Sequence, residues 1–298
     1  MGFKSGFVAI IGRPNAGKST LLNKILGQKV VITSDKVQTT RRRIRGIYNS
    51  EKGQIVFVDT PGVHKPLHKL GEFLLEEVKF AIPDADLVLF VVDGTEIAGA
   101  GDKWIVENLL NQNIPIILTV NKVDMIKSME KREENINSYK ELFAGKIPPI
   151  AKISAKTGRN IDDFMKIIFR KLPNGPKYYP DEEITDQNMR SICSELIREK
   201  VLISTHEEIP HSVAVVVDKY EESEKITRIS ATIFVEQESQ KGILIGEAGK
   251  MIKKIGTEAR REMEKIIETK VFLDLYVKVR KDWRKKDPHL KDLGYFNP

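Results

Sequence analysis

The sequence predicts an α/β domain with a mostly parallel sheet and one antiparallel edge strand, followed by a smaller α+β domain. Three observations lead to this fold class. Short apolar runs alternate with helical patterns over residues 1–172, which is typical of a buried parallel sheet covered by helices. Two strand-like runs are separated only by SEKG, which predicts a hairpin. A stretch rich in proline and glycine then interrupts the alternation, and the order of elements changes after it.

The strands of the first domain are expected at 7–12, 44–49, 54–59, 87–93, 115–121 and 149–154. Helical stretches separate most of them, for example at 20–26, 72–82, 102–110 and 161–172. The second and third strands form the hairpin and should be antiparallel. The others are joined through helices, and this favours parallel pairing.

The second domain is expected to run helix, strand, strand, helix, helix, strand, which describes a compact α+β unit. These elements are predicted at 187–203, 212–220, 225–235, 239–245, 250–267 and 271–279. The predicted organisation is a first domain at 1–172, a linker at 173–186, a second domain at 187–280 and a basic C-terminal tail at 281–298.

Composition narrows the class of protein. The chain has 298 residues, of which 41% are hydrophobic, enough for two packed cores. No apolar run is long enough to span a bilayer, and the apolar start is expected to be a buried strand rather than a signal peptide. The single cysteine, Cys193, excludes an internal disulfide and favours a reducing, cytoplasmic setting. The net charge of +7 favours anionic partners, either nucleic acid or a membrane surface.

A phosphate-binding loop is predicted where the first strand meets the first helix. The motif GRPNAGKS fits G-x-x-x-x-G-K-[ST] in the strand-loop-helix context that it requires. Backbone N–H groups would surround the phosphates, while Lys18 reaches the β- and γ-phosphates and the Ser19 hydroxyl coordinates Mg²⁺. The candidate nucleotide-binding residues here are Gly12, Arg13, Pro14, Asn15, Ala16, Gly17, Lys18, Ser19 and Thr20.

A second segment, DTPG, lies about 40 residues later at the end of a predicted strand. It consists of Asp59, Thr60, Pro61 and Gly62. Asp59 is expected to reach Mg²⁺, and the Gly62 N–H is placed to bond the γ-phosphate and to release the following loop after hydrolysis. The next residue is Val63, where a water-orienting Gln is often found.

A third motif selects the base. NKVD, which is Asn121, Lys122, Val123 and Asp124, follows a predicted strand. The Asp124 carboxylate can accept hydrogen bonds from N1–H and N2–H₂ of guanine, a pair of donors that adenine lacks. Asn121 and the Lys122 stem are expected to brace the loop and pack on the base. The SAK segment, Ser154, Ala155 and Lys156, should complete the pocket through its backbone N–H groups.

The stretch VVITSDKVQTTRRRIR shows neither helical nor strand periodicity and is predicted to be the first switch loop. Thr40 is the preferred candidate for a second Mg²⁺ hydroxyl, and Thr39 is the alternative. A solvated basic strand start is the competing interpretation, particularly for the four arginines that follow.

In the second domain, GEAG separates two helical patterns, and the order of elements is that of a type II KH domain. In KH domains this loop clamps about four single-stranded nucleotides. The candidate RNA-binding residues are Gly246, Glu247, Ala248, Gly249, Lys250, Lys253 and Lys254. Glu247 departs from the pattern, because a phosphate would repel a carboxylate that pointed toward it.

The tail alternates basic residues with an aromatic one, a pattern that suits phosphate contact and base stacking. Its candidate RNA contacts are Lys281, Trp283, Arg284 and Lys285. A solvated basic end is the alternative.

Taken together, GRPNAGKS, QTTRR, DTPG, NKVD and SAK resemble the translation-factor-related small GTPases, and with the second domain the chain is similar to the Era family over about residues 5–298. The resemblance implies a P-loop GTPase domain followed by a type II KH domain. It also implies a slow GTP-hydrolysing switch that binds the 3′ end of 16S rRNA and acts in small (30S) ribosomal subunit assembly and rRNA maturation. A cytoplasmic monomer, with peripheral association to the inner, anionic face of the cell membrane, is expected on the same ground.

The resemblance also bears on catalysis. Members of this class often carry a hydrophobic residue at the position of Val63, and many have an Asn in the P-loop, here Asn15, that is linked to a bound K⁺. A monovalent cation can neutralise charge between the β- and γ-phosphates. Bracing of the loop is the alternative role for Asn15. The catalytic candidates are Lys18, Asn15, Thr40 and Gly62, the metal candidates are Ser19, Thr40 and Asp59, and the cofactors are GTP or GDP with Mg²⁺.

Two alternative functions stay open on the residues alone. One is a nucleotide-gated RNA-binding scaffold with negligible hydrolysis. The other is a GTPase that acts in tRNA modification or at a membrane, with the second domain serving as a protein-binding module.

Overall fold

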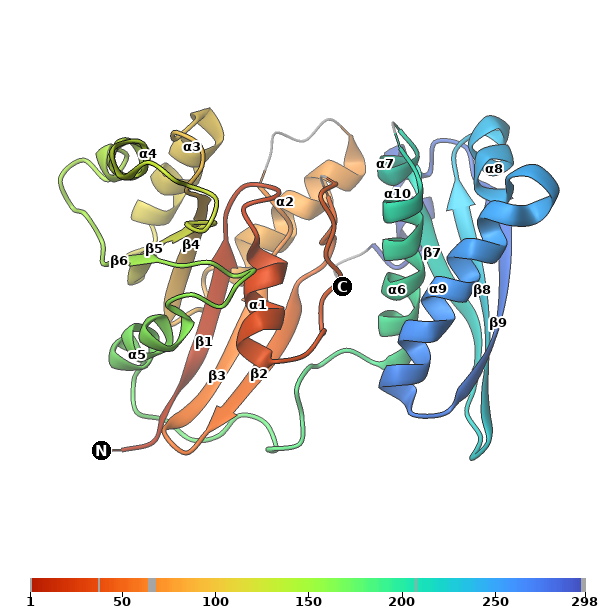
Figure 1. The fold of residues 1–298 in the computed structure, drawn as a ribbon, viewed down its shortest axis with the longest axis horizontal. Coiled ribbons are helices and arrows are strands. Elements are labelled where there is room, and N and C mark those ends of the chain that lie inside the picture. Colours follow the sequence, from red (N-terminus) through yellow and green to blue (C-terminus); the bar gives the residue numbers. More distant parts are fainter. Residues whose placement is uncertain (1, 37, 64–67, 207, 296–298) are drawn as a thin grey trace. The chain divides into compact units, whose positions relative to one another are not determined.

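The computed structural model describes residues 2–36, 38–63, 68–206 and 208–295. Contacts divide the chain into two compact units (Figure 1). Unit 1 comprises Met1–Thr33, Thr40–Pro66 and Leu74–Asp186, and unit 2 comprises Ser34–Thr39, Leu67–Phe73 and Gln187–Pro298.

Unit 1 is built on a six-stranded sheet of order β2-β3-β1-β4-β5-β6. The strands are β1 Lys4–Ile11, β2 Ile44–Ser50, β3 Gly53–Asp59, β4 Leu87–Asp93, β5 Ile116–Asn121 and β6 Ile150–Lys152. β2 is antiparallel to β3, whereas the other neighbouring strands are parallel. The predicted mostly parallel sheet with one antiparallel edge strand is therefore confirmed.

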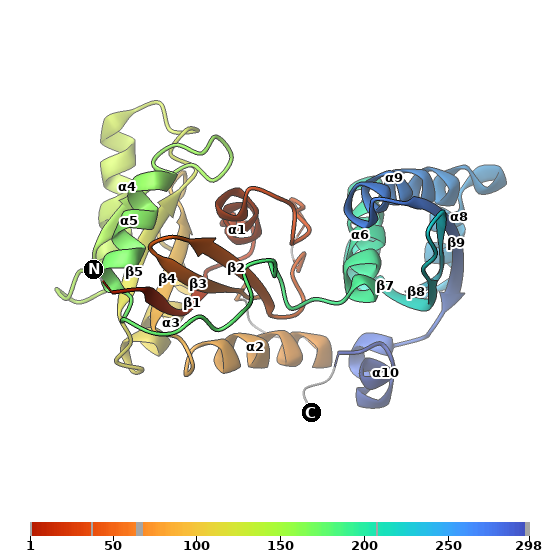
Figure 2. The same ribbon diagram turned by 90° about the horizontal axis from the view of Figure 1, so that it is seen from below.

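Helices cover both faces of this sheet, as Figures 1 and 2 show. They are α1 Lys18–Leu26, α2 Lys69–Ala81, α3 Ala100–Leu110, α4 Met129–Glu141 and α5 Ile161–Lys171. Side chains alternate along β1, so Val8 and Ile10 pack with α1 and α5 while Ala9 and Ile11 pack with α2, α3 and α4. The two cores are nearly free of water-exposed surface, which makes this sheet a rigid support for the loops at its edge.

The segment expected to be a linker lies against the edge of unit 1. Thr185 forms an antiparallel bridge with Gly46 of β2. The Gln54 Oε1 accepts hydrogen bonds from the backbone N–H of Tyr178 at 2.7 Å and of Tyr179 at 3.0 Å. Residues 173–186 are thus hydrogen-bonded along β2 and β3 and belong to the first unit.

Unit 2 contains a three-stranded sheet of order β7-β8-β9, in which β7 is antiparallel and β9 parallel to β8. Its elements are α6 Met189–Ser204, α7 Ile209–Ser212, β7 Ala214–Glu221, β8 Ile226–Val235, α8 Glu238–Ile245, α9 Lys250–Ile267, β9 Lys270–Val279 and α10 Asp287–Asp292. Apart from the two short helices α7 and α10, this is the predicted order. One apolar core joins α6, α8 and α9 to one face of the sheet.

Short segments from the first half of the chain group with unit 2. The buried Arg198 of α6 donates hydrogen bonds to the carbonyl oxygens of Gln38 and Thr39. The ring of Phe73 packs edge-on against Tyr295, with 5.9 Å between the ring centres. The two carbonyl oxygens and the Glu195 carboxylate give the buried guanidinium its partners, without which its burial would be costly.

No helix in the described parts of the chain is both long enough and apolar enough to cross a membrane.

Candidate nucleotide site and nucleic-acid groove

The phosphate-binding loop lies between β1 and α1, and two glycines permit its shape. Gly17 precedes α1 with φ 91°, in the left-handed region, and a Cβ at Gly12 would lie 2.1 Å from the carbonyl oxygen of Val91. The Lys18 Nζ donates to the carbonyl oxygens of Gly12 and Arg13, both at 3.1 Å. Burial lowers the pKa of Lys18 to about 8, against the opposing effect of Asp59. An anion beside this ammonium group would favour its charged form and raise the pKa again.

Three oxygen-bearing side chains meet next to this loop. The Ser19 hydroxyl donates to Asp59 Oδ2 at 2.7 Å and lies 2.9 Å from the Thr40 hydroxyl, which is 3.3 Å from the same carboxylate oxygen. Asp59 is fully buried at the end of β3, and its Oδ1 has no hydrogen-bond partner. Burial raises the pKa of Asp59, and the Lys18 ammonium and the hydrogen bonds from Ser19 and Thr40 only partly offset this effect.

This donor set fits Mg²⁺. The ion prefers hard oxygen ligands, commonly takes one or two carboxylates, and completes its shell with water and substrate phosphates. Among the described residues there is no group of three or more His, Cys, Asp or Glu side chains that could hold a metal by itself. A metal at Ser19, Thr40 and Asp59 would therefore depend on the phosphates of a nucleotide for further ligands.

The structure separates the two threonines of the first switch loop. Thr40 is buried and faces Ser19 and Asp59. The Thr39 hydroxyl instead donates to the carbonyl oxygen of Lys36 at 2.6 Å. The geometry therefore favours Thr40 as the metal-facing residue.

The arginines after Thr40 have protein partners. Arg43 donates from its backbone N–H and its Nε to Glu77, and Arg45 pairs with Asp186. Arg41 is buried. These three are thus part of the fold of unit 1 rather than a solvated basic strand start.

The second switch segment passes directly beside the phosphate loop. A Cβ at Gly62 would lie 2.7 Å from the Pro14 Cα, and the Val63 N–H donates to the Gly12 carbonyl oxygen at 3.2 Å. The Val63 side chain is buried in the apolar cluster that includes Ile11 and Val78. It is a core residue in this structure. The loop predicted to be released after hydrolysis continues into residues 64–67, which lie outside the described part of the chain.

The candidate base site is braced by Asn121. Its Nδ2 donates to the carbonyl oxygen of Ala16 at 2.9 Å, and its Oδ1 accepts from the Ala155 N–H at 2.9 Å. This side chain therefore ties the phosphate loop to the SAK segment. Asp124 lies nearby in sequence and is exposed, so that its carboxylate is accessible.

Two of the three backbone N–H groups of the SAK segment have partners within the protein. The Ser154 N–H donates to the carbonyl oxygen of Arg159 at 3.1 Å, and the Ala155 N–H donates to Asn121. Both N–H groups are engaged with the protein in this structure, and the Ala155 N–H shapes the site by holding Asn121. Sequence reasoning could not foresee this, since it depends on two loops that are 34 positions apart.

One functional neighbour was missed from the sequence. Asp93 ends β4 and pairs with the Lys122 Nζ at 2.5 Å. Burial opposes ionisation, but hydrogen bonds from Lys122 and Thr95 hold the pKa of Asp93 below its usual value. A carboxylate at the carboxyl end of a parallel strand was the available signal, because ligands bind at that edge of such sheets.

The GEAG loop joins α8 to α9. Gly246, Ala248 and Gly249 all have positive φ, and Gly249 ends the loop with open space around its Cα. Glu247 points to solvent with 86% of its side chain exposed and pairs with Lys250 at 3.0 Å. The carboxylate therefore does not block the loop. Lys250 follows Gly249 as the first residue of α9, whose N-terminal dipole favours anions.

A groove of about 370 Å³ lies between α9 and β9 in unit 2. Its lining is apolar at the base and basic at the rim, and consists of Ile252, Lys253, Gly256, Thr257, Arg260, Val271, Phe272, Leu273 and Leu275. Ile252 lines the groove, whereas Leu244 is fully buried in the core. The groove begins at Ile252 and Lys253, in the first turn of α9 after the GEAG loop.

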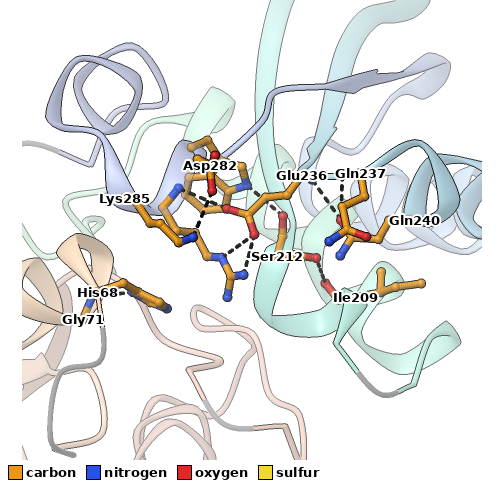
Figure 3. Close-up of polar contacts among 11 residues, drawn as sticks. His68, Gly71, Ile209, Ser212, Glu236, Gln237, Gln240, Asp282 and Lys285 are labelled. Atoms are coloured by element: carbon orange, nitrogen blue, oxygen red, sulfur yellow. Dashed lines mark hydrogen bonds and ion pairs between the residues drawn. The ribbon is translucent and has the colours of Figure 1, made fainter.

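The role predicted for Trp283 is wrong in this structure. Its ring is fully buried, stacks on Tyr295 with 5.8 Å between ring centres, and donates from Nε1 to the Ser212 carbonyl oxygen. It cannot stack on a base without leaving this core. Arg284 pairs with Glu236, and Lys281 is exposed. Lys285 pairs with Asp282, as Figure 3 shows. Residues 281–295, the described part of the tail, are folded into unit 2 around Trp283 and are not a free basic end.

Comparisons with known proteins agree with this geometry. Residues 7–122 match the family model of the 50S ribosome-binding GTPases, and residues 208–284 match the KH domain model. The chain is 50% identical to GTPase Era of Nostoc sp. over 98% of this chain and 90% of that protein. It is 48% identical to GTPase Era of Halothermothrix orenii, with 99% of both chains covered.

Solved structures give the same result. A crystal structure of Era in complex with MgGDPNP and nucleotides 1506–1542 of 16S ribosomal RNA matches with a TM-score of 0.95 and 38% identity, over 99% of this chain and all of that one. A variant of Aquifex aeolicus Era bound to GDP·AlF4⁻ matches with the same TM-score, identity and coverage. The identity to the curated relatives extends over both domains, and the chain therefore belongs to the Era family of GTPases.

Proposed function

We propose that this chain is a GTP-hydrolysing switch that binds the 3′ end of 16S rRNA and acts in assembly of the small ribosomal subunit. The proposed binding of GTP with Mg²⁺ is supported by the buried cluster of Ser19, Thr40 and Asp59 beside the phosphate loop. A buried carboxylate with an unpartnered oxygen is costly unless a cation or a donor meets it. Mg²⁺ bound with a nucleotide provides that cation.

The residues would divide the work as follows. The backbone of the phosphate loop and Lys18 hold the β- and γ-phosphates, while Ser19, Thr40 and Asp59 hold the metal. Bound Mg²⁺ would neutralise charge on the phosphates during transfer. Gly62, where a Cβ would meet Pro14 of the phosphate loop, would sense the γ-phosphate through its N–H. Asp124 reads guanine, and Asn121 keeps the base loop and the phosphate loop in a fixed relation.

We expect Val63→Ala to retain slow hydrolysis within a few-fold of the wild type, because the Val63 side chain is buried in an apolar cluster and carries no hydrogen-bonding group. The cost should appear as stability instead, with a loss of about 1–2 kcal/mol from the cavity created. Single-turnover GTP hydrolysis and thermal melting measure the two effects.

Asn15→Ala is the companion variant. Asn15 has φ 63° within the phosphate loop, and a bound K⁺ is proposed there on the family resemblance. We expect any faster turnover in K⁺ than in Na⁺ to disappear in this variant, while GTP binding remains. If K⁺ stimulation survives, Asn15 only braces the loop. If Val63→Ala abolishes turnover with GTP still bound, the proposed water-positioning by backbone groups is wrong.

The RNA half of the function is supported by unit 2. A relative with the same fold throughout was solved with MgGDPNP and the 3′-terminal region of 16S rRNA. In this chain, the GEAG loop and the basic rim of the groove, Lys253 and Arg260, provide the features that clamp a single strand. Cytoplasmic location, a monomeric state and peripheral membrane association remain predictions from the sequence.

Gly249 offers a sharp test of RNA binding. Its Cα faces open space, whereas a Cβ at Gly246 would lie 2.8 Å from the Met251 Cβ, so Gly249 is the position at which a side chain fits. We expect Gly249→Asp to weaken binding of a 16S rRNA 3′-terminal oligonucleotide at least 10-fold, since its carboxylate would meet phosphate. Fluorescence anisotropy measures the dissociation constant.

Gly249→Asn is the matched control. Both substitutions place a side chain of the same shape at φ 75°, where Asn and Asp are the best-tolerated residues after glycine, and they differ by one charge. RNA binding should fall clearly further for Asp than for Asn. Equal affinities for wild type and both variants would refute the KH interpretation and leave the nucleotide half standing.

A scaffold without hydrolysis is the remaining competitor. Absence of GTP turnover in K⁺ and in Na⁺, with and without the RNA, would establish it.

A further inference from the structure

Exposed aromatic and basic side chains lie along one face of the sheet in unit 2. We call this surface the outer sheet face and define it by Arg228, Phe234, Phe272, Asp274, Tyr276 and Lys278. β8 and β9 run parallel and in register, with Arg228 opposite Phe272 and Phe234 opposite Lys278. Successive side chains on a strand point to opposite faces, so these even-numbered residues share one face. Their odd-numbered neighbours Leu273 and Leu275 pack with the helices in the core.

The aromatic residues of this face are unusually accessible. Phe272 is 46% exposed and Tyr276 is 53% exposed. The Arg228 guanidinium lies 5.4 Å from the centre of the Phe272 ring, and that of Arg280 lies 5.9 Å from the Phe234 ring centre. Large exposed apolar side chains on a strand leave hydrophobic surface in water, and grouped ones commonly mark an interaction site.

The outer sheet face is continuous with the groove. Phe272 lines the groove between α9 and β9 and also belongs to the exposed row on β9. From Phe272 the row runs past Asp274 and Tyr276 to Lys278, a distance of about 20 Å along the strand. A strand of RNA that leaves the groove at Phe272 would therefore meet this row next.

We propose that the outer sheet face is a second RNA-binding surface, on which a single strand that occupies the groove continues and stacks a base on Tyr276. The cations Arg228 and Lys278 flank this aromatic row and meet the phosphates. This inference rests on the proposed RNA binding by unit 2 and extends its footprint beyond the groove.

The chemistry of the face favours single-stranded nucleic acid over an apolar protein segment. Cations interleaved with accessible aromatic rings are the arrangement that binds single strands without strict sequence preference. Asp274 lies between the two aromatic residues of β9 and is exposed. A carboxylate there repels phosphate, but it accepts hydrogen bonds from the exocyclic amino groups of bases. The backbone of the RNA is thus expected near the cations and the base edges near Asp274.

Two RNAs and one exposed side chain test the proposal in the full-length protein. A 16S rRNA 3′-terminal oligonucleotide of about four nucleotides fills the groove, and one of about twelve, extended on both sides, reaches past it. We expect the longer RNA to bind the wild type more tightly. Tyr276→Ala should weaken the longer RNA about 5- to 100-fold, the equivalent of one stacked base, and leave the shorter RNA unchanged.

Matched variants separate stacking, charge and folding. Tyr276→Phe should retain the affinity for the longer RNA, since it keeps the ring. Lys278→Gln should reduce the slope of log K against log salt by about 0.7 for the longer RNA alone. Gly249→Asp should weaken both RNAs. If Gly249→Asp has no effect, the proposed RNA binding itself fails.

If the longer RNA binds no more tightly than the shorter one, or if Tyr276→Ala binds both like the wild type, the second surface is refuted and an apolar protein partner becomes the better occupant.

Discussion

Replacing Thr40 with Val is expected to lower the rate of GTP hydrolysis at saturating nucleotide by about 100-fold or more, in keeping with the loss of one group that contacts the transferring phosphate and its metal. The Thr40 hydroxyl lies 2.9 Å from Ser19 Oγ and 3.3 Å from Asp59 Oδ2 in a buried site. Val has nearly the same shape but no oxygen to offer. In the same variant, the Mg²⁺ concentration needed for half-maximal turnover should rise. Single-turnover hydrolysis measured at a series of Mg²⁺ concentrations gives both the rate and this concentration.

The neighbouring threonine is the control. Thr39→Val removes a hydroxyl that bonds the Lys36 carbonyl oxygen and does not face the metal-binding cluster. It should change turnover by less than a few-fold, with any cost confined to about 1 kcal/mol of stability. If the two variants lose equal activity, or if only Thr39→Val loses it, the assignment of the switch threonine is wrong.

Asp124→Asn is expected to change the base preference of the protein from guanine to xanthine. The carboxylate accepts two hydrogen bonds from guanine, each worth about 1.5–3 kcal/mol because the acceptor is charged. Their loss should weaken GTP about 100- to 10,000-fold. An Asn amide can donate to the C2 oxygen of xanthine, so xanthosine triphosphate should bind the variant more tightly than GTP does. Competition titration with both nucleotides measures the exchange.

Folding does not confound this test. Asp124 is exposed, so the substitution should change the free energy of unfolding by less than about 0.5 kcal/mol. Asp93→Asn provides a contrast, because it removes the partner of Lys122 and should weaken GTP and xanthosine triphosphate together. Unchanged preference in Asp124→Asn, with the fold intact, would show that another residue reads the base.

Local sequence patterns were sufficient to predict much of the fold. The hairpin of β2 and β3 followed from two apolar runs and a four-residue turn, and α9 begins and ends where its periodicity predicted. α4 was missed because its sequence, MEKREENINSYKE, is strongly polar and buries only Asn135, Ile136 and Tyr139. An apolar stripe that narrow gives little periodic signal, and tertiary packing stabilises the helix instead.

The tail shows the opposite error. Basic residues around Trp283 indicated an exposed nucleic-acid contact, yet the indole is buried against Tyr295 and bonds to Ser212, which lies 71 positions earlier. A sequence pattern records which side chains are present but not which surface receives them. Among the described residues of unit 2, Phe272 and Tyr276 are exposed aromatic side chains. The alternation of side chains along their strand could not show which face of the sheet the helices cover.

The sequence by itself determined the chemistry of the nucleotide site, because the loop glycines, Lys18 and the strand-end carboxylate are contiguous motifs whose local backbone shape dictates their use. Only the tertiary structure decided between Thr39 and Thr40, turned Val63 into a core residue, and engaged the Ala155 N–H with Asn121. Each of these outcomes depends on side chains brought together from distant loops at one edge of the sheet. The orientation of a side chain toward metal, core or solvent is fixed by that packing and is absent from any local pattern.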